Sequence, residues 1–206
     1  MRFSADDPQR GAVYDAESSV VGGTRYRSRA DMEACVASVT TSDWWVGRGW
    51  PNPVRCRIAP NGWGECNHPG REGCNRCAAR GGIDSRLKER WFVRFPGFRD
   101  DATEAQVRLA LKHGEPIDAD AWPWAWHDVV IAHELAHVSL LSEPVVYDVG
   151  HGPVFCRRHL EIVLSIAGCE VADELTRAWV AHGVRWYPPI DWDVAAGAPA
   201  PFVAIA

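Results

Sequence analysis

The 206-residue sequence lacks any long hydrophobic run, because its most apolar segment, residues 129–141, contains two histidines and a glutamate. It has no stretch of the ~18 apolar residues that indicate a membrane-spanning helix. The first residues also lack the apolar core of a secretory signal, so we expect a cytoplasmic protein with no membrane partner. The seven cysteines are an odd number, which favours reduced thiols or metal ligation over a disulfide framework.

An excess of positive charge is missing as well. Lys and Arg number 22 against 27 Asp and Glu, for a formal net charge of -5. This total argues against a protein dedicated to binding nucleic acid. The charge is unevenly distributed, however, since residues 48–99 carry 11 basic and 4 acidic side chains. Nucleic acid therefore remains an alternative partner through this basic middle segment.

Hydrophobic periodicity and breaker residues predict both helices and strands. We expect one α+β domain over residues 1–193, with a small sheet packed on the helix that begins near residue 126, and an Ala/Pro-rich tail at 194–206. The bulky residues 44–46 are predicted to be extended. The predicted helices are 8–20, 29–39, 103–113, 126–141, 153–167 and 171–182, and the predicted strands are 54–58 and 91–95.

The sequence His133-Glu134-Leu135-Ala136-His137 is an HExxH motif. On a helix, residues i and i+4 lie one turn apart on the same face, so both imidazoles can bind one Zn²⁺. The intervening Glu134 can then reach a water at the metal and act as general base. The motif predicts a zinc-dependent hydrolase with His133 and His137 as ligands and Glu134 as the catalytic residue.

A catalytic zinc usually takes three protein ligands. Glu161, on the next predicted helix, is one candidate for the third. His151 is the better one, because it lies in His151-Gly152-Pro153, where proline at a helix start directs the chain back toward the preceding helix.

Supporting roles are less well determined by the sequence. Asp128 or Asp148 could orient an imidazole. Four residues near the motif are candidates for stabilising an oxyanion, although each is more readily an ordinary surface residue: Tyr147, Arg157, Arg158 and His159.

HExxH followed by H-G-P-x-F at the start of the next helix resembles the SprT-like metalloproteases, which include the Spartan proteases. The chain is more closely similar to a family of HExxH metallohydrolases from actinobacteria and their phages. The residues that carry this similarity are Asp7-Pro8-Gln9-Arg10, Val13-Tyr14, Glu17 and Ala181-His182-Gly183-Val184. The resemblance implies a zincin-like fold with His133, His137 and His151 as ligands and Glu134 as base, and it supplies no substrate.

A second group of metal-ligating residues lies in a Cys-rich, basic insertion at residues 56–82. Cys74 and Cys77 have the two-residue gap that lets one turn present two thiolates to a metal. A structural zinc knuckle would take its four ligands from Cys56, Cys66, His68, Cys74 and Cys77. Unpaired thiols in a flexible loop are the alternative. The remaining three cysteines, Cys35, Cys156 and Cys169, fall in apolar helical patterns and are predicted to be buried.

Two functions follow from these patterns. The first is a zinc metallopeptidase that acts on a peptide or protein substrate, with one catalytic zinc and a second, structural zinc if the cysteines bind one. The alternative is a non-catalytic module that binds nucleic acid or protein through residues 48–99. The enzyme requires Glu134, whereas the binding module would tolerate its replacement by Gln.

Overall fold

The computed structural model describes residues 7–59, 91–96, 98, 101–117, 123, 125–140 and 150–186. Within them the chain is α+β, with mostly helical content and one two-stranded sheet. The elements are α1 (Arg10–Ser19), α2 (Arg29–Thr40), α3 (Asp43–Gly47), β1 (Val54–Ala59), β2 (Trp91–Pro96), α5 (Asp101–His113), α6 (Asp128–Leu140), α7 (Pro153–Ala167) and α8 (Cys169–Ala181).

The predicted helices are confirmed to within a few residues at their ends. The helix α2 begins as expected, because the Ser28 hydroxyl accepts a hydrogen bond from the backbone N–H of Asp31 at 3.1 Å. The helix α1 begins at Arg10, so Pro8 precedes it instead of occupying its first turn.

Residues 44–46 are helical, so the prediction of an extended segment there is wrong. The Ser42 hydroxyl accepts a hydrogen bond from the backbone N–H of Trp45 at 3.2 Å and starts α3. The indole of Trp45 is fully buried and donates to the carbonyl of Pro51 at 2.8 Å. Capping and burial of this tryptophan therefore outweigh the preference of bulky residues for a strand.

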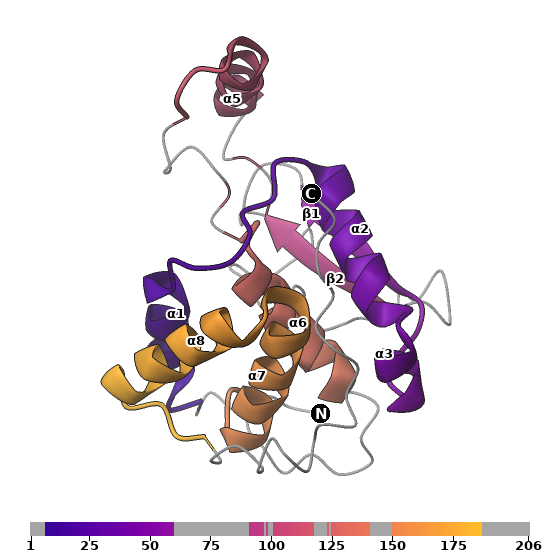
Figure 1. The fold of residues 1–206 in the computed structure, drawn as a ribbon, viewed down its shortest axis with the longest axis vertical. Coiled ribbons are helices and arrows are strands. Elements are labelled where there is room, and N and C mark those ends of the chain that lie inside the picture. The colour runs from indigo at the N-terminus through magenta and orange to yellow at the C-terminus, as the bar shows by residue number, and fades with distance from the viewer. Residues whose placement is uncertain are drawn as a thin grey trace, which may run out of the picture.

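The strands β1 and β2 are confirmed and pair in parallel, with Val54 opposite Trp91 and Ala59 opposite Pro96. The helix α2 packs on β1, and β2 contacts α6. The sheet thus lies between α2 and the helix that carries the HExxH motif, as Figure 1 shows.

The helix α6 is the centre of the hydrophobic core, since every one of its residues is buried. It packs along α7, which in turn contacts α8. The helices α1 and α8 lie side by side on the flank of the molecule opposite α2, and α5 stands apart from the other helices (Figure 1). Burying a helix on all faces places its polar side chains in an apolar environment, where they require specific partners.

Several predictions concern residues outside the described ranges. These are the cluster ligands Cys66, His68, Cys74 and Cys77, the tail at 194–206, and both Tyr147 and Asp148. Among the described residues, no helix is both long enough and apolar enough to cross a membrane.

Candidate metal centre

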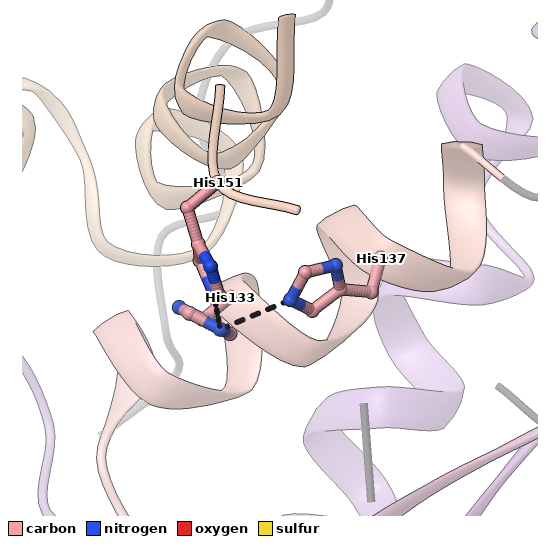
Figure 2. Close-up of side chains that lie close together, drawn as sticks. All are labelled: His133, His137 and His151. Atoms are coloured by element: carbon pink, nitrogen blue, oxygen red, sulfur yellow. Dashed lines mark hydrogen bonds between the residues drawn. The ribbon is translucent and has the colours of Figure 1, made fainter. Parts of the chain in front are cut away.

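Three imidazoles meet between α6 and the start of α7. His133 and His137 lie one turn apart on α6, and His151 precedes Pro153, the first residue of α7. The Nε2 atom of His133 lies 3.2 Å from Nε2 of His137 and 3.1 Å from Nε2 of His151. Figure 2 shows all three rings directed toward one point. The structure therefore brings together the three residues that the sequence predicted as metal ligands.

This geometry fits a tetrahedral zinc ion. Zinc–nitrogen bonds of about 2.0–2.1 Å place neighbouring ligand atoms about 3.3 Å apart in a tetrahedron, close to the observed separations. Burial lowers the pKa of His133 and of His137 well below the ordinary histidine value. Both are thus neutral imidazoles, the form that binds a metal.

Phe155 supports the three imidazoles. Its ring centroid lies 4.8 Å from that of His133, 4.4 Å from that of His137 and 4.8 Å from that of His151. Phe155 is fully buried in the first turn of α7. The phenylalanine of the H-G-P-x-F segment is therefore a packing surface for the candidate ligands.

Glu134 is 5% exposed and directly follows His133 on α6. Among the described residues its Oε2 atom has no hydrogen-bond partner. Burial, followed by the charge of Glu17, raises the pKa of Glu134 to about 8. A buried carboxylate oxygen without a protein partner is suited to bind water, and a divalent cation nearby would favour its ionised form.

His151 is held by Asp7, from the segment before α1. Asp7 Oδ2 lies 2.6 Å from His151 Nδ1 and accepts a hydrogen bond from the His151 backbone N–H at 3.2 Å. A carboxylate at Nδ1 fixes the proton there and leaves Nε2 free to bind a metal.

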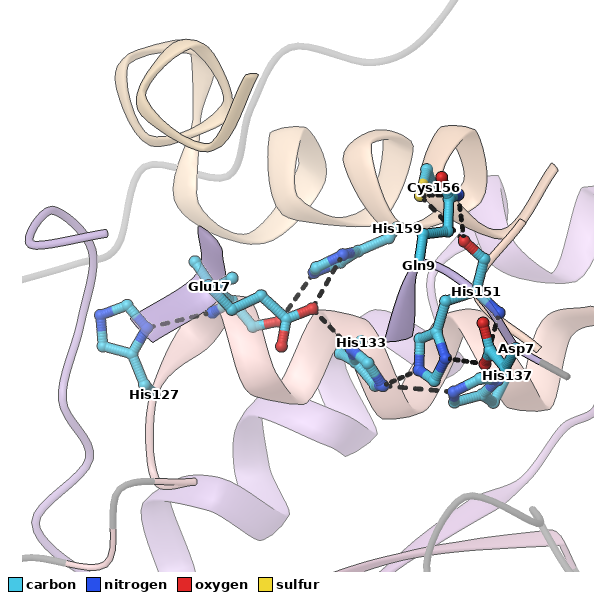
Figure 3. Close-up of polar contacts among 10 residues, drawn as sticks. Asp7, Gln9, Glu17, His127, His133, His137, His151, Cys156 and His159 are labelled. Carbon is cyan, nitrogen blue, oxygen red and sulfur yellow. Dashed lines mark hydrogen bonds and ion pairs between the residues drawn. The ribbon is translucent and has the colours of Figure 1, made fainter. Parts of the chain in front are cut away.

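His133 is held by Glu17 of α1, whose Oε1 atom lies 2.6 Å from His133 Nδ1. The same oxygen lies 3.5 Å from Nδ1 of His159, and His159 Nε2 is 2.9 Å from the carbonyl oxygen of Val129. Figure 3 shows Glu17 between the two imidazoles, with Asp7 on the far side of the site. His133 and His151 thus each have a carboxylate oxygen within hydrogen-bond distance of Nδ1. This arrangement raises the basicity of a ligand and sets the orientation of its ring.

Gln9 joins the two ends of the described chain at this site. Its amide nitrogen donates to the carbonyls of His151 at 2.6 Å and Arg185 at 2.9 Å, and its oxygen accepts from the Arg185 backbone N–H at 2.8 Å. The segment after α8 turns back toward Gln9 at Gly183, which has a φ of +69°. The turn is closed by a hydrogen bond from the Val184 N–H to the carbonyl oxygen of Trp179 at 2.9 Å. The segment before α1 and the segment after α8 therefore meet beside His151.

The supporting role predicted for Asp128 is wrong. Asp128 does not orient an imidazole, because its carboxylate accepts from the backbone N–H of Thr24 at 2.6 Å and from the hydroxyl of Tyr26 at 2.5 Å. Asp128 instead fixes residues 24–26 to the start of α6.

Glu161 is engaged by arginines and is not placed with the candidate ligands. Its carboxylate forms ion pairs with Arg48 at 3.7 Å, with Arg157 at 3.4 Å and with Arg158 at 3.3 Å. The guanidinium carbon of Arg158 also lies 4.1 Å from the Trp50 ring centroid. These contacts fasten α7 to the segment after α3, and Arg157 and Arg158 are thereby accounted for as structural residues.

His159 is fully buried behind Glu17, so it does not face a substrate. The role of Glu17 at the site was not predicted from the sequence. One signal was available: Glu17 follows Val13 by one turn and adjoins Ala16, on the buried face of α1. A carboxylate on the apolar face of a helix requires a buried partner.

The cysteine predictions have mixed outcomes. Cys156 is buried and Cys35 half-buried, but Cys169 is exposed at the first position of α8, so its predicted burial is wrong. Cys56, the one described member of the predicted zinc knuckle, is half-buried on β1. Burial raises the pKa of its thiol to about 12.

No protein-family model matches the chain, and comparisons with curated proteins and with solved structures likewise found no match. The function is therefore proposed from the chemistry of the site and from the motifs in the sequence.

Proposed function

We propose that this protein is a zinc-dependent metallohydrolase, and specifically a metallopeptidase. The observation that supports this proposal is the convergence of three neutral imidazoles beside a buried glutamate with an unpartnered oxygen. His133, His137 and His151 would hold the ion. A structural zinc commonly has four protein ligands, whereas three histidines leave a position open for water and substrate.

A bound zinc supplies two effects, since it lowers the pKa of a water ligand to about 7 and polarises the carbonyl under attack. Glu134 accepts the proton of the attacking water and then transfers it to the leaving amine. Asp7 and Glu17 keep the protons of His151 and His133 on Nδ1, away from the ion. The similarity of the motifs to the SprT-like metalloproteases supports the choice of a peptide bond as the substrate.

Metal content tests the proposal first. The protein is purified without chelator or affinity tag, and zinc per chain is measured for wild type and for the double variant His133→Ala/His137→Ala. We expect the variant to lose one equivalent. Any equivalent that remains would be assigned to the cysteines. A variant that keeps the wild-type zinc content, or a zinc-supplemented wild type that stays empty, contradicts the proposal.

The variant Glu134→Gln then distinguishes a metallopeptidase from a non-catalytic binding module. This change preserves the shape of the side chain and removes the base, so zinc content should stay at the wild-type level while hydrolysis of labelled casein falls by at least about 10²-fold. Equal activity in wild type and Glu134→Gln would contradict hydrolysis by this site.

A further inference from the structure

Tyr14 of α1, which the mechanism above does not use, lies against the candidate ligands, and the guanidinium of Arg10 lies over its ring. Arg10, Tyr14 and Glu17 lie at positions i, i+4 and i+7, on one face of the helix. The Tyr14 ring stacks on His133, with 5.3 Å between centroids and 20° between planes, and meets His151 edge-on at 5.2 Å. Tyr14 therefore contacts two of the three imidazoles.

The phenol of Tyr14 is a hydrogen-bond donor held beside two of the candidate ligands. A phenol carries its proton at neutral pH, so the Tyr14 hydroxyl can donate a hydrogen bond. The Arg10 side chain can only donate hydrogen bonds, and its guanidinium lies over the Tyr14 ring. Among the described residues the Tyr14 hydroxyl donates no hydrogen bond, so its proton is available to a bound group.

Arg10 brings positive charge to the same place. Its guanidinium carbon lies 5.4 Å from the centroid of the Tyr14 ring. Within the part of the chain that the structure describes, Arg10 has no carboxylate partner.

We propose that Tyr14 and Arg10 form the subsite that binds the negatively charged oxygen of the tetrahedral state in peptide hydrolysis. Tyr14 is the catalytic residue of the pair and donates its O–H to that oxygen without transferring the proton. Arg10 is a positioning residue whose guanidinium packs over the Tyr14 ring and adds positive charge. This inference rests on the proposed metallopeptidase function and names a donor that the sequence did not identify.

A donor aimed at charge that develops only in the transition state acts on kcat more than on KM, and removing one such donor typically lowers kcat about 10²–10³-fold. Tyr14→Phe removes the hydroxyl and keeps the ring that packs on His133 and His151. We therefore expect Tyr14→Phe to lower kcat by this factor, with KM changed less than about threefold.

Binding of a phosphonamidate dipeptide supplies a readout that does not depend on turnover. Its tetrahedral, charged phosphorus group imitates the transition state. With zinc-loaded full-length protein, calorimetry should show a Kd at least about tenfold higher for Tyr14→Phe than for wild type, and a smaller increase for Arg10→Met that Arg10→Lys partly reverses. The zinc Kd, measured by chelator competition, should be unchanged in Tyr14→Phe. Asp15→Asn, an exposed change on the same helix, is the matched control.

Three results would overturn the inference. The first is a Tyr14→Phe protein that binds the phosphonamidate as wild type does. The second is a loss of zinc affinity in that variant, because Tyr14 would then only support the imidazoles. If circular dichroism shows that Tyr14→Phe does not fold, the inference is tested with Arg10→Met instead. The third contradicting result is then an Arg10→Met protein that binds the phosphonamidate with wild-type affinity.

The proposed function fails in a different way. In that case wild type binds no zinc, or Glu134→Gln is as active as wild type. A wild type that binds zinc, hydrolyses casein through Glu134 and retains full phosphonamidate affinity after Tyr14→Phe contradicts only the inference about Tyr14 and Arg10.

Discussion

The carboxylate of Asp7 holds His151 through both the ring and the backbone, although the two residues are 144 positions apart in the chain. The backbone of Gly150 makes this contact possible. Gly150 has a φ of +67°, and a Cβ atom on it would overlap Asp7 Oδ2. Glycine is therefore required next to the candidate ligand both for its backbone conformation and for the approach of Asp7.

The Asp7 contact predicts the behaviour of Asp7→Ala. Loss of the carboxylate leaves His151 free to rotate and to move its proton to Nε2, so the zinc Kd should rise about 10–100-fold. Competition with a chelator measures this change, and Asp15→Asn is the control on neighbouring α1. Unaltered zinc affinity in Asp7→Ala would show that packing against Phe155 alone orients His151.

Gly150→Ala should weaken zinc binding through the same contact. The added methyl displaces Asp7, so most of the loss should disappear when the change is made in an Asp7→Ala background. Residues in contact are expected to be non-additive in this way. Full additivity would assign the effect of Gly150→Ala to backbone strain alone.

Glu17→Gln tests the second carboxylate. The amide can still accept from His133 Nδ1 through its oxygen, but it removes the charge and places an NH₂ group at the buried position of Oε2, which has no partner among the described residues. We expect a 10–100-fold rise in the zinc Kd. The losses in Glu17→Gln and Asp7→Ala should add in the double variant, because the two carboxylates hold different imidazoles. A Glu17→Gln protein with the wild-type zinc Kd would contradict the role of Glu17.

The parts of the site that the sequence predicted share one property, which is that local patterns specify them. His133 and His137 are related by the helical repeat, and His151 by the turn that Gly152 and Pro153 impose before α7. The boundaries of α7 follow from the same signals, with Pro153 in its first turn and Gly168, at φ +83°, at its end.

The parts that sequence reasoning did not predict depend on distant contacts. Asp7 and Glu17 lie 144 and 116 residues from the imidazoles they hold, and no local pattern joins them. Apart from Glu134, Asp128 is the nearest carboxylate in sequence to His133, yet it accepts hydrogen bonds from Thr24 and Tyr26. For residues 44–46, burial of Trp45 and the Ser42 cap determined a helix where side-chain bulk had indicated a strand.

Thiol reactivity tests the packing around β1. The thiolate is the nucleophile, and burial raises the pKa of Cys35 to about 11 and that of Cys56 to about 12. At pH 8 both thiols should alkylate with iodoacetamide far more slowly than the exposed Cys169, and their rates should rise about tenfold per pH unit up to pH 10. Peptide mapping by mass spectrometry resolves the individual sites.

The same experiment addresses the predicted zinc knuckle. If Cys56 ligates a metal, a chelator should accelerate its alkylation while Cys35 is unchanged. If burial alone protects Cys56, the chelator should have no effect on either rate. Alkylation of Cys56 as fast as that of Cys169 would contradict its burial beneath α2.

Glu174 fixes the turn after α1 to α8 and predicts a pH-dependent stability. Its Oε1 accepts from the Val21 N–H at 2.8 Å and its Oε2 from the Gly22 N–H at 2.9 Å, and these bonds hold the pKa of Glu174 below its usual value of 4.5. A carboxylate whose pKa is lower in the folded state stabilises the protein above the unfolded pKa, and that contribution is lost as the pH falls through the folded pKa. Glu174→Gln should therefore lower the Tm by a few degrees at pH 7, and the difference from wild type should shrink below pH 4.5. Glu170→Gln, in the exposed first turn of the same helix, controls for the loss of one negative charge. A Tm difference for Glu174→Gln that persists unchanged at low pH would mean that shape, and not the ionised hydrogen bonds, holds the turn in place.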